Sequence, residues 1–250
     1  MKIISFVDDA KEKVIRALSE LAGSDCCTRK RVSFSAGSAD SVVITGGGIE
    51  KASVTHLILK NVKPPESSCY VDYMVFQMEI FPENPYCPMG HFNTEWALTG
   101  NGPYHMNLDL FPAANCDREL ETVGKTMDRV AERYGFDPIK MREGLSSHYA
   151  LDHWDKPLSS CVGCKLMHLD ETQIDLFIEA YHTFFTAYLT LLKDTMQRPF
   201  TEQENLLKLR RNGKWLEYLT LKDAAVKMGL SVGIPPEVII RLSYPPSAVF

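Results

Sequence analysis

The chain has 250 residues, 45% of them hydrophobic and 24% charged, and its formal net charge is −5. This composition is typical of a globular domain, and it argues against a disordered chain, a collagen-like repeat and a protein that binds nucleic acid through bulk positive charge. No apolar run approaches the ~20 residues of a membrane-spanning helix, and the first residues include acidic ones where a signal peptide would be apolar. We therefore expect a cytoplasmic protein with a single domain over residues 1–250 and no membrane contact.

The seven cysteines are an odd number and are scattered along the chain, which predicts reduced thiols rather than a disulfide framework. Cys161 and Cys164 have the spacing of a metal or redox pair, but no second ligand pair accompanies them. We interpret this pair as structural and expect no bound metal.

Hydrophobic periodicity predicts a first helix over residues 8–22, which Gly23 ends, followed by polar and small residues to about residue 40. A series of strands then begins at Ser41, with turns rich in glycine and proline between them. The expected strands cover residues 41–44, 53–62, 70–81, 91–98 and 103–111. Because the connections are short, these strands should form an antiparallel meander.

Helical periodicity returns in the second half of the chain. Helices are expected at 117–134, 171–195 and 200–211, the last one beginning with the capping box Thr201 to Glu204. Strands are expected at 159–169 and 215–221, followed by a short helix from Lys222 and a terminal segment from Pro235. The sum is an α+β fold, a three-layer α/β/α sandwich with a central antiparallel sheet flanked by helices. The helical spacing of Tyr181, Phe184, Phe185 and Tyr188 favours core packing over a roof for a planar ligand.

One face of the expected strands gathers acidic, imidazole and amide side chains, because alternate residues of a strand share a face. The set comprises Gln77, Glu79, His91, Asn93, Glu95, His105, Asn107 and Asp109. A solvated face is the simpler explanation, but such a face is normally rich in Lys, Thr, Ser and Arg. Clustered carboxylates and imidazoles shift one another's pKa, which is how acid–base sites are made. The pattern therefore favours a proton-transfer site.

Over nearly its whole length the chain resembles the oxygen-dependent coproporphyrinogen III oxidases, which implies a large antiparallel sheet and a tetrapyrrole substrate. The matching segments are GGGIEKASV (46–54), NPYCPMGHFN (84–93), LDLFP (108–112), PFTEQENLLKLRRNGKWLEY (199–218), KDAAVKMGL (222–230) and PPEVIIRLSYPPSAV (235–249). After HFN those oxidases have a tyrosine and an arginine, where this chain has Thr94 and Glu95. Two further family arginines are replaced, near Ser160 and at Ala224. Because guanidinium groups grip carboxylates, their loss argues against coproporphyrinogen, which carries four propionates.

A shorter region, MEIFPENPYCPMGH (78–91) with LDLFP (108–112), resembles the ferredoxin-dependent bilin reductases. This resemblance implies that Asp109 protonates the bilin, that His91 relays protons to it, and that Glu79 donates at an end ring. An Asp–His pair holds a proton near neutral pH, as such a relay needs. It further implies no bound metal or flavin, and electrons that come from a docked ferredoxin. The residues expected to bind the substrate are Gln77, Asn93, Glu95, His105, Asn107, Asp223 and Arg211.

An acidic ferredoxin needs a basic docking patch, and Lys208, Arg210, Arg211 and Lys214 are grouped in the sequence. A solvated helix end, or a propionate clamp at an arginine, explains the same group. The sequence as a whole predicts ferredoxin-dependent reduction of a biliverdin-type bilin. The alternatives are a divergent coproporphyrinogen III oxidase that uses O2 and a non-catalytic tetrapyrrole carrier. Both a monomer and a homodimer fit the sequence.

Overall fold

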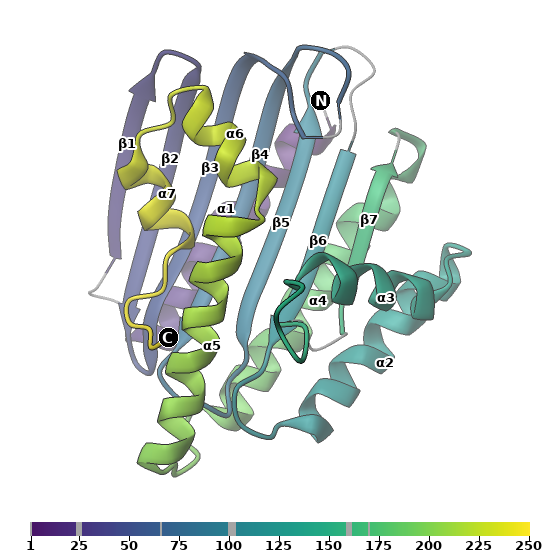
Figure 1. Cartoon of the computed structure of the whole chain (residues 1–250). Helices are drawn as coiled ribbons and strands as arrows, with labels where there is room; N and C mark the ends of the chain where they lie inside the picture. Colours follow the sequence, from purple (N-terminus) through teal and green to yellow (C-terminus); the bar gives the residue numbers. More distant parts are fainter. Residues whose placement is uncertain (1, 24–26, 66, 100–103, 159–161, 170) are drawn as a thin grey trace.

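The computed structural model describes residues 2–23, 27–65, 67–99, 104–158, 162–169 and 171–250. Within these residues, a seven-stranded antiparallel sheet runs in sequential order and carries helices on both faces (Figure 1). This confirms the predicted α+β fold and the meander. The strands are β1 (Cys27–Phe34), β2 (Gly37–Gly46), β3 (Ile49–Val62), β4 (Val71–Pro82), β5 (Met89–Ala97), β6 (Tyr104–Phe111) and β7 (Cys164–Leu169).

The helices form the two outer layers. Helix α1 (Lys2–Ala22) packs on β2 and β3, and α4 (Ile174–Thr195) packs on β6 and on α2 (Asp117–Arg133). On the other side of the sheet lie α5, α6 and α7, and Figure 1 shows them in front of the strands. The bounds of these three helices are α5 Glu202–Leu221, α6 Ala224–Ser231 and α7 Pro236–Ser243. Two further elements are α3 (Pro138–His148) and η1 (Glu171–Gln173), a 3-10 turn before α4.

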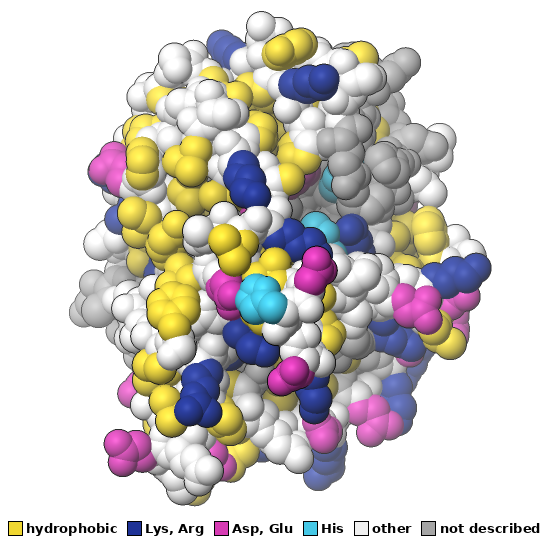
Figure 2. All heavy atoms as spheres, in the orientation of Figure 1, with side chains coloured by type: hydrophobic (Ala, Val, Ile, Leu, Met, Phe, Trp, Pro, Cys, Tyr) yellow, Lys and Arg dark blue, Asp and Glu magenta, His cyan; other side chains and the backbone are white. Residues whose placement is uncertain are grey.

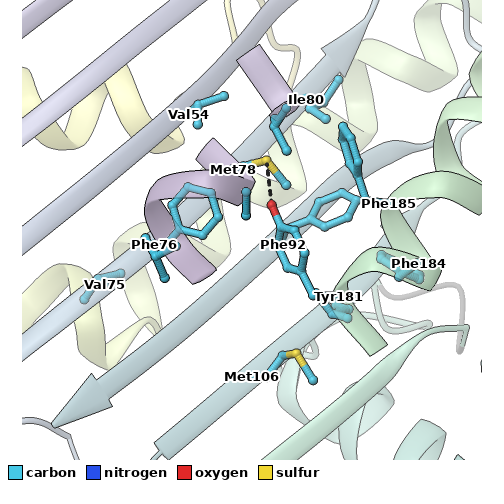
Figure 3. Packing of buried hydrophobic residues seen from close by; sticks show 14 of the residues in the cluster. Val54, Val75, Phe76, Met78, Ile80, Phe92, Met106, Tyr181, Phe184 and Phe185 are labelled. Carbon is cyan, nitrogen blue, oxygen red and sulfur yellow. Dashed lines mark hydrogen bonds between the residues drawn. The ribbon is translucent and has the colours of Figure 1, made fainter. Parts of the chain in front are cut away.

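The apolar face of the sheet packs against α4 and forms the main core. Figure 3 shows Met78 and Phe92 of the sheet meeting Tyr181 and Phe185 of this helix. The Tyr181 hydroxyl donates to the Met78 sulfur at 3.5 Å. The aromatic residues of α4 are therefore core, as predicted, and they lie on the opposite side of the sheet from the polar residues.

The predicted strand at 215–221 is wrong, because α5 continues without a break from Glu202 to Leu221. The alternation of large and polar residues there resembles a strand, but Trp215, Tyr218 and Leu219 have i, i+3, i+4 spacing and are buried on one side of a helix. The predicted helix start is confirmed, since Thr201 and Glu204 form a capping box. This continuous helix places Trp215 and Tyr218 over the polar face of the sheet.

Other elements differ from the prediction at their ends or were missed. Strand β1 lies in the segment of polar and small residues where no strand was predicted, and most of its residues are exposed. Helix α3 was missed, although Asp137 caps it and Pro138 is its first residue. Helix α1 begins earlier than expected, and the segment from Pro235 contains α7. Residues 159–161 of the predicted strand, with Cys161, lie outside the described residues, and Cys164 is a buried free thiol. No described helix is long and apolar enough to span a membrane.

Candidate functional site

The register of the sheet brings the predicted polar residues into adjacent cross-strand rows. Glu79 on β4 lies opposite His91 on β5, which in turn lies opposite Asp109 on β6. Directly opposed residues in antiparallel strands have Cβ atoms ~4.5–5.5 Å apart. The neighbouring rows are Gln77–Asn93–Asn107 and Glu95–His105. The expected grouping of these side chains on one face is therefore present.

This polar face is covered rather than solvated. Helices from the front layer and the end of α3 enclose a cavity of about 140 Å³ above it. Apart from half-buried Gln77, all the predicted polar residues of the sheet are buried. The polar residues that line the cavity are Tyr73, Gln77, His91, Asn93, Glu95, His105, Asn107, His148, Tyr149, Tyr218, Asp223 and Ser243. The alternative of a solvated face is therefore wrong.

Glu79 is completely buried, just below the cavity lining. Its carboxylate accepts hydrogen bonds from Gln77 Nε2 at 2.6 Å and from Trp215 Nε1 at 3.1 Å. Burial raises the pKa of Glu79 to about 8, although the nearby Lys51 ammonium acts against the rise. Lys51 itself donates to the Ile240 carbonyl at 2.9 Å, and burial lowers its pKa. Glu79 is therefore a carboxyl group that can hold a proton near neutral pH.

His91 lies between Glu79 and Asp109 and contacts a group of aromatic rings. Its Nδ1 is 3.0 Å from the Tyr149 hydroxyl, and its ring is 5.4 Å from that of Trp215. Burial lowers the pKa of His91 to about 3, and the nearby His148 adds to the effect. At neutral pH the imidazole is therefore uncharged, with one ring nitrogen as a donor and the other as an acceptor. Asp109 is completely buried, and its Oδ1 accepts from the Leu110 amide at 2.7 Å.

A second polar group faces the cavity from its α3 and α5 side. His148 lies between Lys165 Nζ and the Tyr218 hydroxyl, each 3.0 Å from one of its ring nitrogens. Burial lowers the pKa of His148 to about 3, with Lys165 contributing. His148 and Tyr149 were not among the predicted site residues, because the helix that ends at them was missed. Trp215 and Tyr218 were missed because their segment was expected to be a strand.

Arg211 does not reach the cavity, contrary to the expectation that it binds substrate. It is buried, and its guanidinium donates to the Phe111 carbonyl at 3.0 Å and to Asn212 Oδ1. Lys208 is likewise buried, with an ion pair to Glu50 and a 2.9 Å hydrogen bond to the Glu83 carbonyl. Both side chains therefore stabilise the interior and are inaccessible to a docked protein.

The predicted basic docking patch is thus reduced to two residues. Arg210 is exposed, and the Lys214 ammonium lies 5.2 Å from the centre of the Trp154 ring. Figure 2 shows the lysine and arginine side chains of this face interspersed with acidic ones. Among the described residues, no His, Cys, Asp and Glu side chains are grouped to hold a metal ion.

Comparison with known proteins identifies the family of the chain. The family model described as Coproporphyrinogen III oxidase matches residues 2–250, and the chain belongs to this family. The chain is 24% identical over 202 residues to the oxygen-dependent coproporphyrinogen-III oxidase of Coxiella burnetii strain Dugway 5J108-111, and 24% identical over 205 residues to that of strain RSA 493 / Nine Mile phase I. Each alignment covers 75% of this chain and 64% of the relative.

These findings confirm the longer of the two resemblances, the one to the oxidases. The chain spans less than two thirds of the length of the curated relatives it matches. The resemblance to the bilin reductases stays a prediction.

Proposed function

We propose that this chain binds a linear tetrapyrrole of the bilin type over the polar face of its sheet and supplies protons while the bilin is reduced. The observation that carries the proposal is the buried row of Glu79, His91 and Asp109 beside a cavity with no lysine or arginine in its described lining. Membership of a family of enzymes that act on tetrapyrroles supports the substrate class.

The charge of the lining favours a bilin over coproporphyrinogen. A ligand with four propionates needs several cations to balance the loss of hydration of its carboxylates. The cavity offers the carboxyl groups of Glu95 and Asp223 instead. A bilin has fewer carboxylates, which can lie at the rim, and its ring nitrogens suit a lining of acceptors.

Binding requires the front helices to move. Ligand pockets usually measure ~300–1,000 Å³, so a cavity of about 140 Å³ is too small for a tetrapyrrole. Helix α6 is the least anchored part of the cover, since Gly229 is its only buried residue. Apolar side chains gather around α6 and α7 in Figure 2, where Leu230 and Ile240 are about half exposed. We expect outward movement of α6 and α7 to admit the ligand.

The proposed chemistry divides proton transfer among the three residues of the row. Each added electron makes the bilin more basic, so each reduction step needs a proton donor within reach. Glu79 holds a proton near neutral pH because it is buried, and Gln77 and Trp215 orient its two oxygens. Neutral His91 accepts a proton at one nitrogen and releases one from the other, and Asp109 delivers the proton to the ligand. The electrons come from an acidic, ferredoxin-like protein.

An anaerobic turnover assay tests this proposal. Protein mixed with biliverdin and a reduced ferredoxin is expected to convert the biliverdin absorption band to that of a reduced bilin. Asp109→Asn, which keeps the size of the side chain, is expected to bind biliverdin but to lose ~100-fold or more in rate, as is usual for general acids. Binding without turnover in either protein would instead favour a non-catalytic carrier. No spectral change on mixing would refute the proposal.

Family membership favours a second candidate, oxygen-dependent oxidative decarboxylation of coproporphyrinogen. In that reaction a buried carboxyl such as Asp109 would accept a proton from the substrate, and O2 would be the oxidant. An aerobic assay for porphyrin fluorescence with coproporphyrinogen distinguishes the two. Porphyrin formation that requires the protein would support the second candidate and contradict the first.

A further inference from the structure

The end of the cavity formed by β5 and β6 presents hydrogen-bond acceptors that have no donor. Asn93 Oδ1 and Asn107 Oδ1 are buried without a partner among the described residues, and each side chain is only 8% exposed. Both side chains line the cavity. A buried carbonyl oxygen without a donor is costly, so these two atoms indicate the position of a ligand that donates hydrogen bonds.

The orientation of the Asn93 amide is fixed by its neighbour. Its Nδ2 is 2.7 Å from Glu95 Oε1, and a carboxylate can only accept. The amide nitrogen must therefore point at Glu95, which leaves Oδ1 as the atom without a partner. The Tyr73 hydroxyl donates to the other Glu95 oxygen at 2.6 Å. Glu95 is thus held rigidly within the cavity wall.

A second carboxyl group lies near Glu95. Asp223 caps α6 by accepting from the Val226 amide at 2.7 Å, and it lines the same cavity. Burial raises the pKa of Asp223 to about 6, and the negative charge of Glu95 adds to the rise. No lysine or arginine among the described lining residues balances the two carboxylates. This end of the cavity is therefore acceptor-rich and negative.

We propose that Glu95, together with Asp223, determines specificity: it binds a ligand end that carries N–H donors and excludes a ligand end that carries a carboxylate. The inference rests on the proposed function for the identity of the natural ligand, a tetrapyrrole that presents its ring nitrogens to Asn93, Asn107 and Glu95. A carboxylate placed at the same position would lose its hydration and be repelled by both acids.

Absorbance titrations with biliverdin and with coproporphyrin III test this specificity. Wild-type protein is expected to bind biliverdin more tightly than coproporphyrin III. Glu95→Gln should reduce the ratio of the biliverdin affinity to the coproporphyrin affinity by ~10-fold or more, as is typical when a charge-assisted contact is lost. Asp223→Asn should shift the ratio in the same direction, and it preserves the helix cap because Asn caps as well as Asp. Glu83→Gln removes an exposed carboxylate outside the cavity and should leave the ratio unchanged.

A pair of small probes of opposite charge tests the cavity independently of any tetrapyrrole. Methylguanidinium and acetate both have planar heavy-atom frames, and both are small enough for a cavity of about 140 Å³. Methylguanidinium is expected to shift the side-chain amide NMR signals of Asn93 and Asn107 in wild-type protein, and much less in Glu95→Gln, whereas acetate should shift neither. A response to the cation in a protein that binds no tetrapyrrole would refute the proposed function but support this inference. Equal responses to both probes, or none to either, would overturn the inference.

Discussion

Trp215 gives the sharpest test of how the buried site is held together. Its side chain is 1% exposed, and its single N–H lies 3.1 Å from Glu79 Oε2 and 2.8 Å from the Ser243 carbonyl. It therefore joins the sheet to the end of α7. Trp215→Phe keeps an aromatic ring against Tyr218 but removes the donor that both oxygens share.

The expected loss of stability follows from these contacts. A buried acceptor left without its donor costs ~1–3 kcal/mol, and the smaller ring adds a cavity cost of ~1 kcal/mol. Because one hydrogen serves both oxygens, we count the acceptor cost once, and the sum is ~2–4 kcal/mol, a large part of the ~5–15 kcal/mol that stabilises a typical domain. Urea denaturation followed by circular dichroism measures this loss as a lower free energy of unfolding.

Trp154→Phe is the matched control. Trp154 Nε1 also donates to a glutamate, Glu217 Oε2, at 2.9 Å. The Glu217 side chain is 28% exposed and is also bound by His153, so water and a second partner replace the lost bond. We expect a loss of at most ~1 kcal/mol. Equal effects of the two substitutions would refute the argument that burial makes the Trp215 contacts strong.

Three other substitutions test separate parts of the structure. The pKa of Glu79 is about 8 in the folded protein and 4.5 in the unfolded chain, so protonation of Glu79 favours the folded state. This contribution to stability is fully present below pH 4.5 and is lost as the pH rises to about 8. Glu79→Gln should therefore abolish a decline in the free energy of unfolding of up to ~1.4 kcal/mol per pH unit across that window, measured by denaturation at several pH values. Lys208→Met should cost ~1–3 kcal/mol by denaturation, because Glu50 keeps its charge without a partner but is partly hydrated. Gly90→Ala should cost ~1–3 kcal/mol in melting experiments, since its Cβ would lie 2.7 Å from the Tyr188 ring, and Tyr188→Leu should relieve part of that cost.

The grouping of the polar residues could be predicted because it depends only on local rules. Alternate residues of a strand share a face, and short antiparallel connections keep neighbouring strands in a narrow range of registers. These rules suffice to bring Glu79, His91 and Asp109 to one side of the sheet. The capping box at Thr201 similarly predicts a helix start from two side chains.

What covers the polar face could not be predicted, because it depends on tertiary packing. The segment from Trp215 to Leu221 has apolar residues that fit both a strand and a helix, and its burial against the sheet decides between them. Arg211 and Lys208 are charged and adjacent in sequence to exposed residues, so nothing local indicates that the fold would bury them. The role of Tyr149 likewise depends on a contact between residues distant in sequence.

A crystal structure of the protein with biliverdin tests the central claim most directly. The bilin is expected between the sheet and a displaced α6 and α7, with its ring nitrogens within hydrogen-bond distance of Asn93 and Asn107 and with Asp109 directly beneath it. A bilin bound elsewhere on the protein, away from the cavity and from the row of Glu79, His91 and Asp109, would contradict the account.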